Sequence, residues 1–142
     1  MALERLQRFI DKARLEYAWL CLQDWFETAD ILFGWGPGRA AIEGARIQIK
    51  HNFHMQALMY WTHNDWLQIL LEYGIVGLGL SLWSYVYLLK CAGFNTRVFW
   101  ALVIFGGAMT VQMPLRHPVG VLILCTLAVQ AFSSRKSTSN LL

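Results

Sequence analysis

The stretch "LQILLEYGIVGLGLSLWSYVYLL", residues 67 to 89, decides the fold because it runs for 23 residues with Glu72 as its only formal charge. A helix needs about 20 apolar residues to cross the ~30 Å hydrocarbon core of a bilayer. The composition of the whole chain agrees, since 56% of its 142 residues are hydrophobic and only 15% are charged. An ordinary soluble domain carries about 25% charged residues. We therefore predict a first transmembrane helix over residues 67–89.

Two further apolar runs, over residues 98–113 and 119–132, flank the sequence "PLRHP". Both are short for complete spans, so they are either tilted helices or a hairpin that crosses only partly. The predicted fold class is an all-α membrane protein, in which an extracytoplasmic helical loop over residues 1–66 precedes about three membrane helices within 67–132. The polar sequence "SSRKSTSN" predicts a disordered tail over 133–142.

The basic residues beside the apolar runs predict the topology. Residues 67 to 142 hold five Lys and Arg against one acidic residue, so the excess positive charge lies in the apolar half and not on a polar face that would bind nucleic acid. Two crossings place Lys90 and Arg97 on the same side as Arg135 and Lys136, and the positive-inside rule makes that side cytoplasmic. We therefore predict a multi-pass membrane protein whose N-terminal loop faces outward, into the periplasm if the source is a Gram-negative bacterium, and whose C-terminus is cytoplasmic.

The first 66 residues predict helices separated by a glycine-rich turn. Apolar residues recur at helical spacing over residues 3–28, which predicts an amphipathic helix. The sequence "GWGPG", residues 34–38, ends that helix because proline and several glycines favour a turn. A short helix is expected over 42–50. An aromatic patch of Phe53, Tyr60 and Trp61 just before the first span suggests a belt at the level of the lipid headgroups.

His63 is the principal candidate for a catalytic residue. Thr62 and Asp65 resemble a capping arrangement, which would place His63 in the first turn of the membrane helix. The positive end of the helix dipole disfavours an imidazolium, so a neutral His63 that accepts a proton is expected. A single histidine at a membrane interface is more commonly a polar anchor than a catalytic residue. The sequence motif around His63 is what favours catalysis.

His63-Asn64 is followed by nine residues and then by Gly74-x-x-Gly77. This string resembles the signature of the bacterial O-antigen ligase and O-antigen polymerase superfamily of membrane glycosyltransferases. "ILFGWGPG", "LEYGIVGLGL" and "MPLRHP" are similar to that family's glycine-rich turn, late membrane helix and proline-containing break. A second pair, His51-Asn52, has Thr62 where the first glycine is required. The resemblance runs from about Arg14 to Phe132 and corresponds to the C-terminal third of a family member.

The resemblance implies a location in the bacterial inner membrane, with a periplasmic N-terminal loop, and an activity in lipopolysaccharide biosynthesis at the cell envelope. Family members move a glycan from undecaprenyl pyrophosphate to an acceptor hydroxyl, on a lipid A core sugar or a growing chain, without a metal or other cofactor. His63 would activate the hydroxyl as general base, and Arg14 would bind the pyrophosphate. Arg39 is a weaker candidate for the pyrophosphate. For either arginine, the rival interpretation is a solvated surface charge.

The remaining motif residues have supporting roles. Asn64, Gly74 and Gly77 complete the signature, and the glycines are expected to permit close helix contact more than to touch substrate. Glu72 would be costly inside a bilayer unless it faces the bundle or an aqueous cavity, so it is equally a functional candidate or a partner for an arginine in helix packing.

A complete family member has about ten or more membrane spans, which leads to two functional hypotheses for a chain of 142 residues. The first is the catalytic-loop portion of a glycan ligase or polymerase, inactive alone and partnered by the remaining transmembrane portion. The alternative is a non-enzymatic membrane protein that associates with an intact homologue and modulates it. The sequence does not separate ligase from polymerase, because the acceptor contacts are not readable from it.

Overall fold

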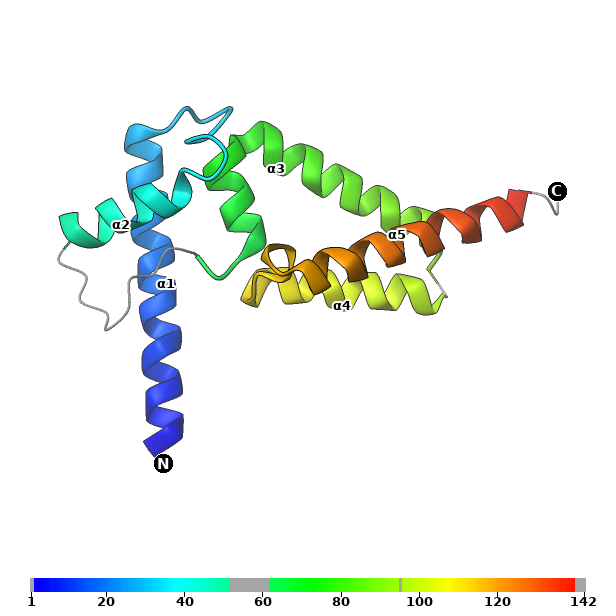
Figure 1. The fold of residues 1–142 in the computed structure, drawn as a ribbon, viewed down its shortest axis with the longest axis horizontal. Helices are drawn as coiled ribbons and strands as arrows, with labels where there is room; N and C mark the ends of the chain where they lie inside the picture. The colour runs from blue at the N-terminus through cyan, green and yellow to red at the C-terminus, as the bar shows by residue number, and fades with distance from the viewer. Residues whose placement is uncertain (1, 52–61, 95, 140–142) are drawn as a thin grey trace. The chain divides into compact units, whose positions relative to one another are not determined.

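The computed structural model describes residues 2–51, 62–94 and 96–139, and over these residues it is helical and contains no β-strand. The predicted all-helical class is therefore confirmed for this part of the chain. Figure 1 shows the order of the elements, which are α1 (Ala2–Thr28), α2 (Ala40–Lys50), α3 (Asp65–Ala92), α4 (Arg97–Val111), a 3-10 turn η1 (Pro114–Arg116) and α5 (Pro118–Ser139).

The chain forms two compact units. The first unit comprises Met1–His63 together with Leu67–Gly77, and the second comprises Asn64–Trp66 together with Leu78–Leu142. The candidate residues Arg14, Arg39 and His63 all belong to the first unit.

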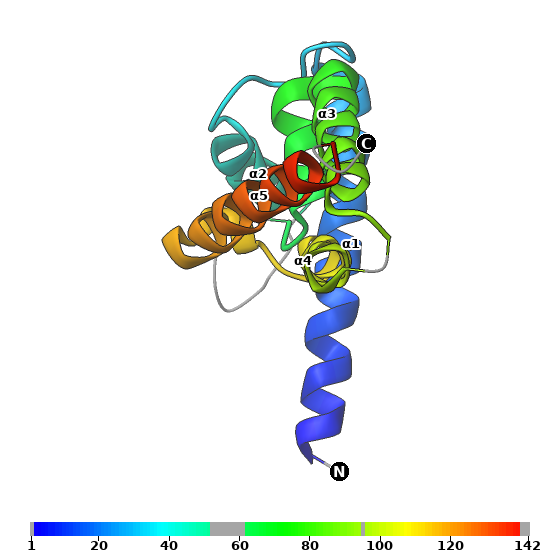
Figure 2. The same ribbon diagram turned by 90° about the vertical axis from the view of Figure 1, so that its right-hand side faces the viewer.

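The core of the first unit confirms the amphipathic helix predicted over 3–28. One face of α1 carries buried apolar side chains spaced four residues apart, as expected for a helix that packs along one stripe. The helix α2, predicted from residue 42 and found from Ala40, lies against α1 (Figures 1 and 2). The core also draws on the glycine-rich turn and on α3, and consists of Tyr17, Cys21, Trp25, Trp35, Ala40, Ile47 and Leu71.

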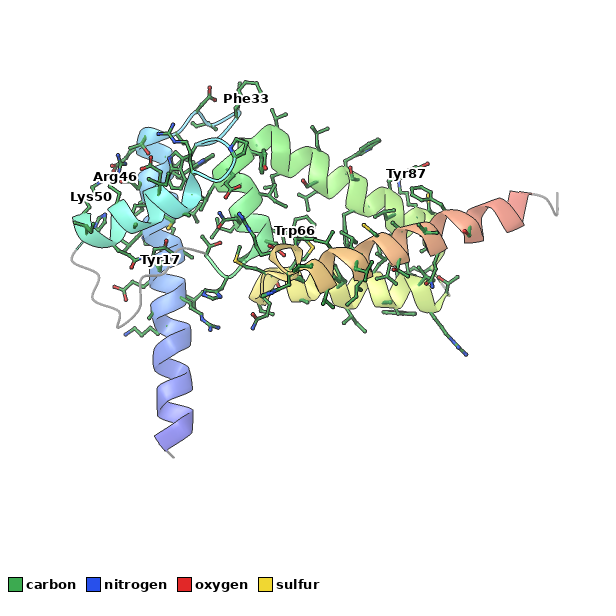
Figure 3. The ribbon with its side chains drawn as sticks, in the orientation of Figure 1. Tyr17, Phe33, Arg46, Lys50, Trp66 and Tyr87 are labelled. Carbon is green, nitrogen blue, oxygen red and sulfur yellow. The ribbon has the colours of Figure 1, made fainter. Side chains whose placement is uncertain are left out.

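A buried carboxylate joins α1 to α2. Asp24 is only 1% exposed, and it accepts hydrogen bonds from Lys50 Nζ at 2.7 Å and from an Arg46 guanidinium nitrogen at 2.9 Å. Figure 3 labels both basic side chains on α2. Burial acts to raise the pKa of Asp24, but the hydrogen bonds and charges of Lys50 and Arg46 outweigh it and hold that pKa below its ordinary value. The carboxylate is therefore ionised and fastens the two helices.

Replacing Asp24 with Asn is expected to lower the free energy of unfolding by about 2 kcal/mol at pH 7, because hydrogen bonds to charged groups contribute roughly 1.5–3 kcal/mol. The folded pKa lies below the unfolded one, so this stabilisation is present above about pH 4 and is lost as the pH falls through the folded pKa. Urea unfolding of the detergent-solubilised chain between pH 3 and pH 7 measures both effects. Glu27→Gln is the control, since Glu27 is exposed and lies 3.6 Å from Lys50. An equal effect of the two substitutions would contradict the role given to Asp24.

The helix α3 is interrupted at Gly74, whose backbone is non-helical with φ 66° and ψ −165°. The glycine-rich turn fills the break. Backbone N–H groups of Trp35 and Gly36 donate to the carbonyls of Leu71 and Glu72, each at 2.9 Å, and two hydrogen bonds run the other way, Ile75 to Ile31 at 3.0 Å and Val76 to Leu32 at 3.2 Å. The orphan groups on both sides of the break are thus satisfied. The prediction of a continuous helix over 67–89 is therefore wrong at Gly74. We call the helix break, together with the turn that is hydrogen-bonded to it, the turn–helix junction.

The second unit is built from the later helices. The helices α4 and α5 lie side by side (Figure 1), and their core includes Cys91, Ala92, Leu102 and Ala131. The hydroxyl of Thr96 caps α4 by accepting from the N–H of Phe99 at 3.1 Å. The break predicted at "PLRHP" is confirmed by the turn η1, whose Leu115 N–H donates to Asp65 Oδ2 at 3.0 Å.

The tail expected to be disordered is helical as far as Ser139, since α5 spans Pro118–Ser139. The segment after Phe132 contains neither glycine nor proline, and extending an existing helix is much easier than nucleating one. Polarity alone was therefore a poor guide to disorder there.

One helix of the described residues, Asp65–Ala92, is long and apolar enough to cross a membrane, whereas the apolar helices Arg97–Val111 and Pro118–Ser133 are shorter. The predicted aromatic belt of Phe53, Tyr60 and Trp61 lies outside the described residues.

Candidate functional site

His63 lies in the segment that precedes α3 and adopts a left-handed backbone conformation, with φ 53°. It is the one non-glycine residue with positive φ among those described. The expectation that His63 occupies the first helical turn is wrong, because α3 begins at Asp65 and the Thr62 hydroxyl donates to Gln68 Oε1 at 3.4 Å. Left-handed conformations cost energy for residues with a Cβ and cluster at functional sites. The backbone therefore singles out the residue that the motif had indicated.

A buried polar network lies beside His63 in the first unit. Thr62, Gln68 and Glu72 are all buried, and Gln68 Nε2 donates to Glu72 Oε1 at 2.6 Å. Together with the Thr62 hydroxyl, these groups form a connected set along the first turns of α3. Fully connected buried polar groups are rigid. Glu72 is thus an acceptor in a network that fixes the segment carrying His63.

Arg14, 49 positions earlier in the chain, acts electrostatically on His63. Burial lowers the pKa of His63, and the positive charge of Arg14 on α1 lowers it further. Both side chains are partly exposed. Both effects favour the neutral imidazole, and their causes are burial and Arg14 where the helix dipole had been expected.

Arg39 belongs to a different part of the first unit. It stands at the N-cap of α2, its side chain is 63% exposed, and its guanidinium lies 3.6 Å from Glu43 Oε1. It lines a polar pocket that also includes Thr28 at the end of α1. Thr28 is 14 residues beyond Arg14, which corresponds to roughly 21 Å along a helix. Arg39 therefore does not share a site with Arg14 and His63.

The motif glycines have structural explanations. A Cβ on Gly74 would meet the backbone of Leu32 and would lie 2.6 Å from the nitrogen of Phe33. A Cβ on Gly77 would meet the Tyr73 side chain, one turn earlier in α3. The expected close contact is thus made by Gly74 with the glycine-rich turn, where a neighbouring helix had been expected. Asn64 is partly buried immediately before α3.

Two acidic residues, Asp24 and Glu43, are buried although neither was predicted to be a site residue. Asp24 follows Tyr17 by seven residues and so falls on the buried stripe of α1, which is a detectable signal for a buried, paired carboxylate. Glu43 is 8% exposed, although its position in the first turn of α2 suggested nothing more than a favourable interaction with the helix dipole.

Comparison of the chain with family models, with curated protein sequences and with solved structures gives no match. The chemistry of the site is therefore argued from its residues. A partly buried imidazole whose pKa is lowered by burial and by a guanidinium suits a reaction in which a proton is removed from one group while an anion is bound.

Proposed function

We propose that this chain forms the catalytic loop and terminal helices of a membrane glycosyltransferase of the O-antigen ligase and polymerase kind. Such an enzyme transfers a glycan from undecaprenyl pyrophosphate to the hydroxyl of a lipid A core sugar or of a growing chain. The observation that carries the proposal is the electrostatic effect of Arg14 on His63, because the sequence motif and the electrostatics of the first unit select the same two residues.

The proposed reaction needs one base and one anion site. His63 takes the proton of the acceptor hydroxyl as the oxygen attacks the anomeric carbon of the donor sugar, and the bond from that carbon to the pyrophosphate oxygen breaks. Undecaprenyl pyrophosphate leaves as an anion, and the Arg14 guanidinium binds its oxygens in a bidentate manner. Stabilisation of the departing charge is the larger electrostatic contribution.

Arg14 has a second effect in this proposal. Its charge keeps the pKa of His63 low in the free protein. Bound pyrophosphate offsets that charge, so the pKa of His63 rises toward its ordinary value of about 6.5. The imidazole thus becomes a stronger base when the donor is in place.

The His63 imidazole is expected to titrate with a midpoint below about 6.5 in the isolated chain, and the midpoint should move upward in Arg14→Gln. It should remain below the ordinary value in that variant, because burial is the larger cause of the shift. Proton NMR of the imidazole in detergent micelles measures the midpoint. Arg39→Gln is the control and should leave it unchanged. An unshifted midpoint in Arg14→Gln would remove the observation that carries the proposal.

A location in the inner membrane is supported by the second unit, whose helices expose large apolar side chains. Ile104 on α4 is 72% exposed and Leu122 on α5 is 67% exposed, an arrangement that suits lipid contact. In α3, the 18 residues after Gly74 extend about 27 Å, close to the ~30 Å of a hydrocarbon core. The first span is then proposed to begin after Gly74, so that Glu72 lies outside it. In this topology His63 is on the periplasmic side and the C-terminus is in the cytoplasm.

The same exposed apolar faces favour a second candidate function, in which the chain associates with an intact ligase or polymerase and modulates it. Expressing the chain in a strain that has its own transferase would then change the length of its surface glycans. His63→Ala should leave that effect in place if the chain is a modulator, whereas a catalytic role requires the imidazole.

A further inference from the structure

The first unit contains a polar pocket of about 350 Å³ where the end of α1, the glycine-rich turn and α2 meet. We call it the α1–α2 pocket, and its lining includes Thr28, Asp30, Trp35, Arg39, Glu43 and Arg46. Its volume falls at the lower end of the roughly 300–1,000 Å³ found for small-molecule sites. Neither Arg14 nor His63 lines it, so the proposed reaction leaves it without a role.

The charges around the α1–α2 pocket balance. Asp30 and Glu43 are acidic, Arg39 and Arg46 are basic, and Glu43 lies 3.6 Å from Arg39 and 3.1 Å from Arg46. Arg46 is also held by Asp24 at 2.9 Å. A phosphate would meet two carboxylates and two arginines that already have acidic partners. The pocket therefore suits a neutral ligand rich in hydrogen-bonding groups more than an anion.

Glu43 is a buried carboxylate in the wall of the pocket. Its Oε2 atom forms an ion pair with Arg46 Nε at 3.1 Å, and its Oε1 atom lies 3.6 Å from Arg39. Because each carboxylate oxygen can accept two hydrogen bonds, Glu43 keeps acceptor capacity beyond these pairs. A ligand hydroxyl in the pocket would supply the donor.

The walls of the pocket are held in place before any ligand binds. Asp30 Oδ1 accepts from the N–H groups of Leu32 at 2.8 Å and Phe33 at 3.3 Å. Trp35 Nε1 donates to Thr28 Oγ1 at 3.0 Å, which fixes the orientation of the indole. Preorganised groups lose little entropy on binding.

We infer that the α1–α2 pocket binds a sugar unit of the glycan. Sugar hydroxyls donate to the carboxylates of Asp30 and Glu43 and accept from Arg39, and the ring is neutral, as the charge balance requires. The choice of a glycan rests on the proposed function, and the pocket deepens that function. Because the pocket lies roughly 21 Å from Arg14 along α1, it holds a sugar remote from the reacting bond. It contributes to glycan affinity and does not take part in the chemical step.

The test is a binding titration of the full chain in lipid nanodiscs, by saturation-transfer NMR and calorimetry. The probes are glucose, galactose and N-acetylglucosamine, with inorganic pyrophosphate as the anion. At least one sugar should bind saturably with a Kd in the millimolar range. Glu43→Gln should weaken it about 10-fold. Arg39→Ala, which removes an exposed side chain and spares the core, should weaken it about 5-fold. Arg97→Ala in the second unit is the control and should change nothing.

Two results would overturn the inference. One is the absence of saturable binding for every sugar in the panel. The other is pyrophosphate binding that tightens in Glu43→Gln, since removing a negative charge would improve an anion site. His63→Asn separates this inference from the proposed function, because it should leave sugar binding unchanged. Sugar binding together with full glycan transfer in His63→Asn would refute the catalytic proposal and leave the sugar pocket standing.

Discussion

Gly74→Ala is expected to lower the free energy of unfolding of the first unit by about 3 kcal/mol or more. Alanine in the left-handed conformation costs about 1–2 kcal/mol, and a methyl group forced against backbone costs roughly 1–3 kcal/mol more. The backbone it would meet is that of Leu32 and Phe33, directly before the glycine-rich turn. Gly34→Ala should have a similar effect, because its Cβ would lie 2.6 Å from the carbonyl oxygen of Leu71. Urea unfolding in detergent, followed by near-ultraviolet circular dichroism, measures both variants.

Gly79→Ala is the matched control for the turn–helix junction. Gly79 lies on the same helix α3, and a Cβ there has no atom within 4 Å. Alanine should stabilise the helix by up to about 1 kcal/mol. If Gly74→Ala and Gly79→Ala changed the free energy of unfolding equally, the close contact between Gly74 and the preceding turn would not contribute to stability.

Under the proposed function, His63→Ala is expected to reduce glycan transfer by about 10³-fold. A general base contributes roughly 10²–10⁴-fold to the rate. His63→Asn should be equally inactive, and it is the better variant structurally, because asparagine tolerates the left-handed backbone that His63 adopts. Lipopolysaccharide ladders on gels report transfer in cells.

His51→Ala is the matched control for His63. His51 is exposed at the end of α2 and starts the His-Asn pair that lacks the required glycine. Its removal should leave the ladder unchanged. A normal ladder in His63→Asn, or an equal loss in His51→Ala, would contradict a specific catalytic role for His63.

The helices of this chain were largely predictable because each carries a local signal. Apolar spacing predicted α1, the glycine-rich turn ended it, and the prolines of "PLRHP" marked the turn η1. These signals operate within a few residues of one another. The prediction of a disordered tail was wrong as far as Ser139 because a polar segment can extend a helix that has already formed.

The turn–helix junction was not predictable from local pattern. A lone glycine inside an apolar run costs only about 1 kcal/mol and does not by itself end a helix. The break at Gly74 depends on hydrogen bonds from Ile75 and Val76 to residues about 44 positions earlier. No periodicity encodes a partner at that distance.

The candidate site was predictable in part. The motif spacing selected His63, and the family resemblance selected Arg14, but the electrostatic effect of Arg14 on His63 is a tertiary property. The role of Glu43 and the α1–α2 pocket had no sequence signal, since an acidic residue in the first turn of a helix is ordinarily explained by the helix dipole.

The release of undecaprenyl pyrophosphate tests the central proposal most directly. Membranes that carry the proposed transferase are given a glycan linked to undecaprenyl pyrophosphate and an acceptor, and the released carrier is quantified over time for the wild type and for His63→Asn. The proposal predicts release coupled to glycan transfer in the wild type and a rate about 10³-fold lower in the variant. Equal rates of release in the two proteins, or no release in the wild type, would contradict it.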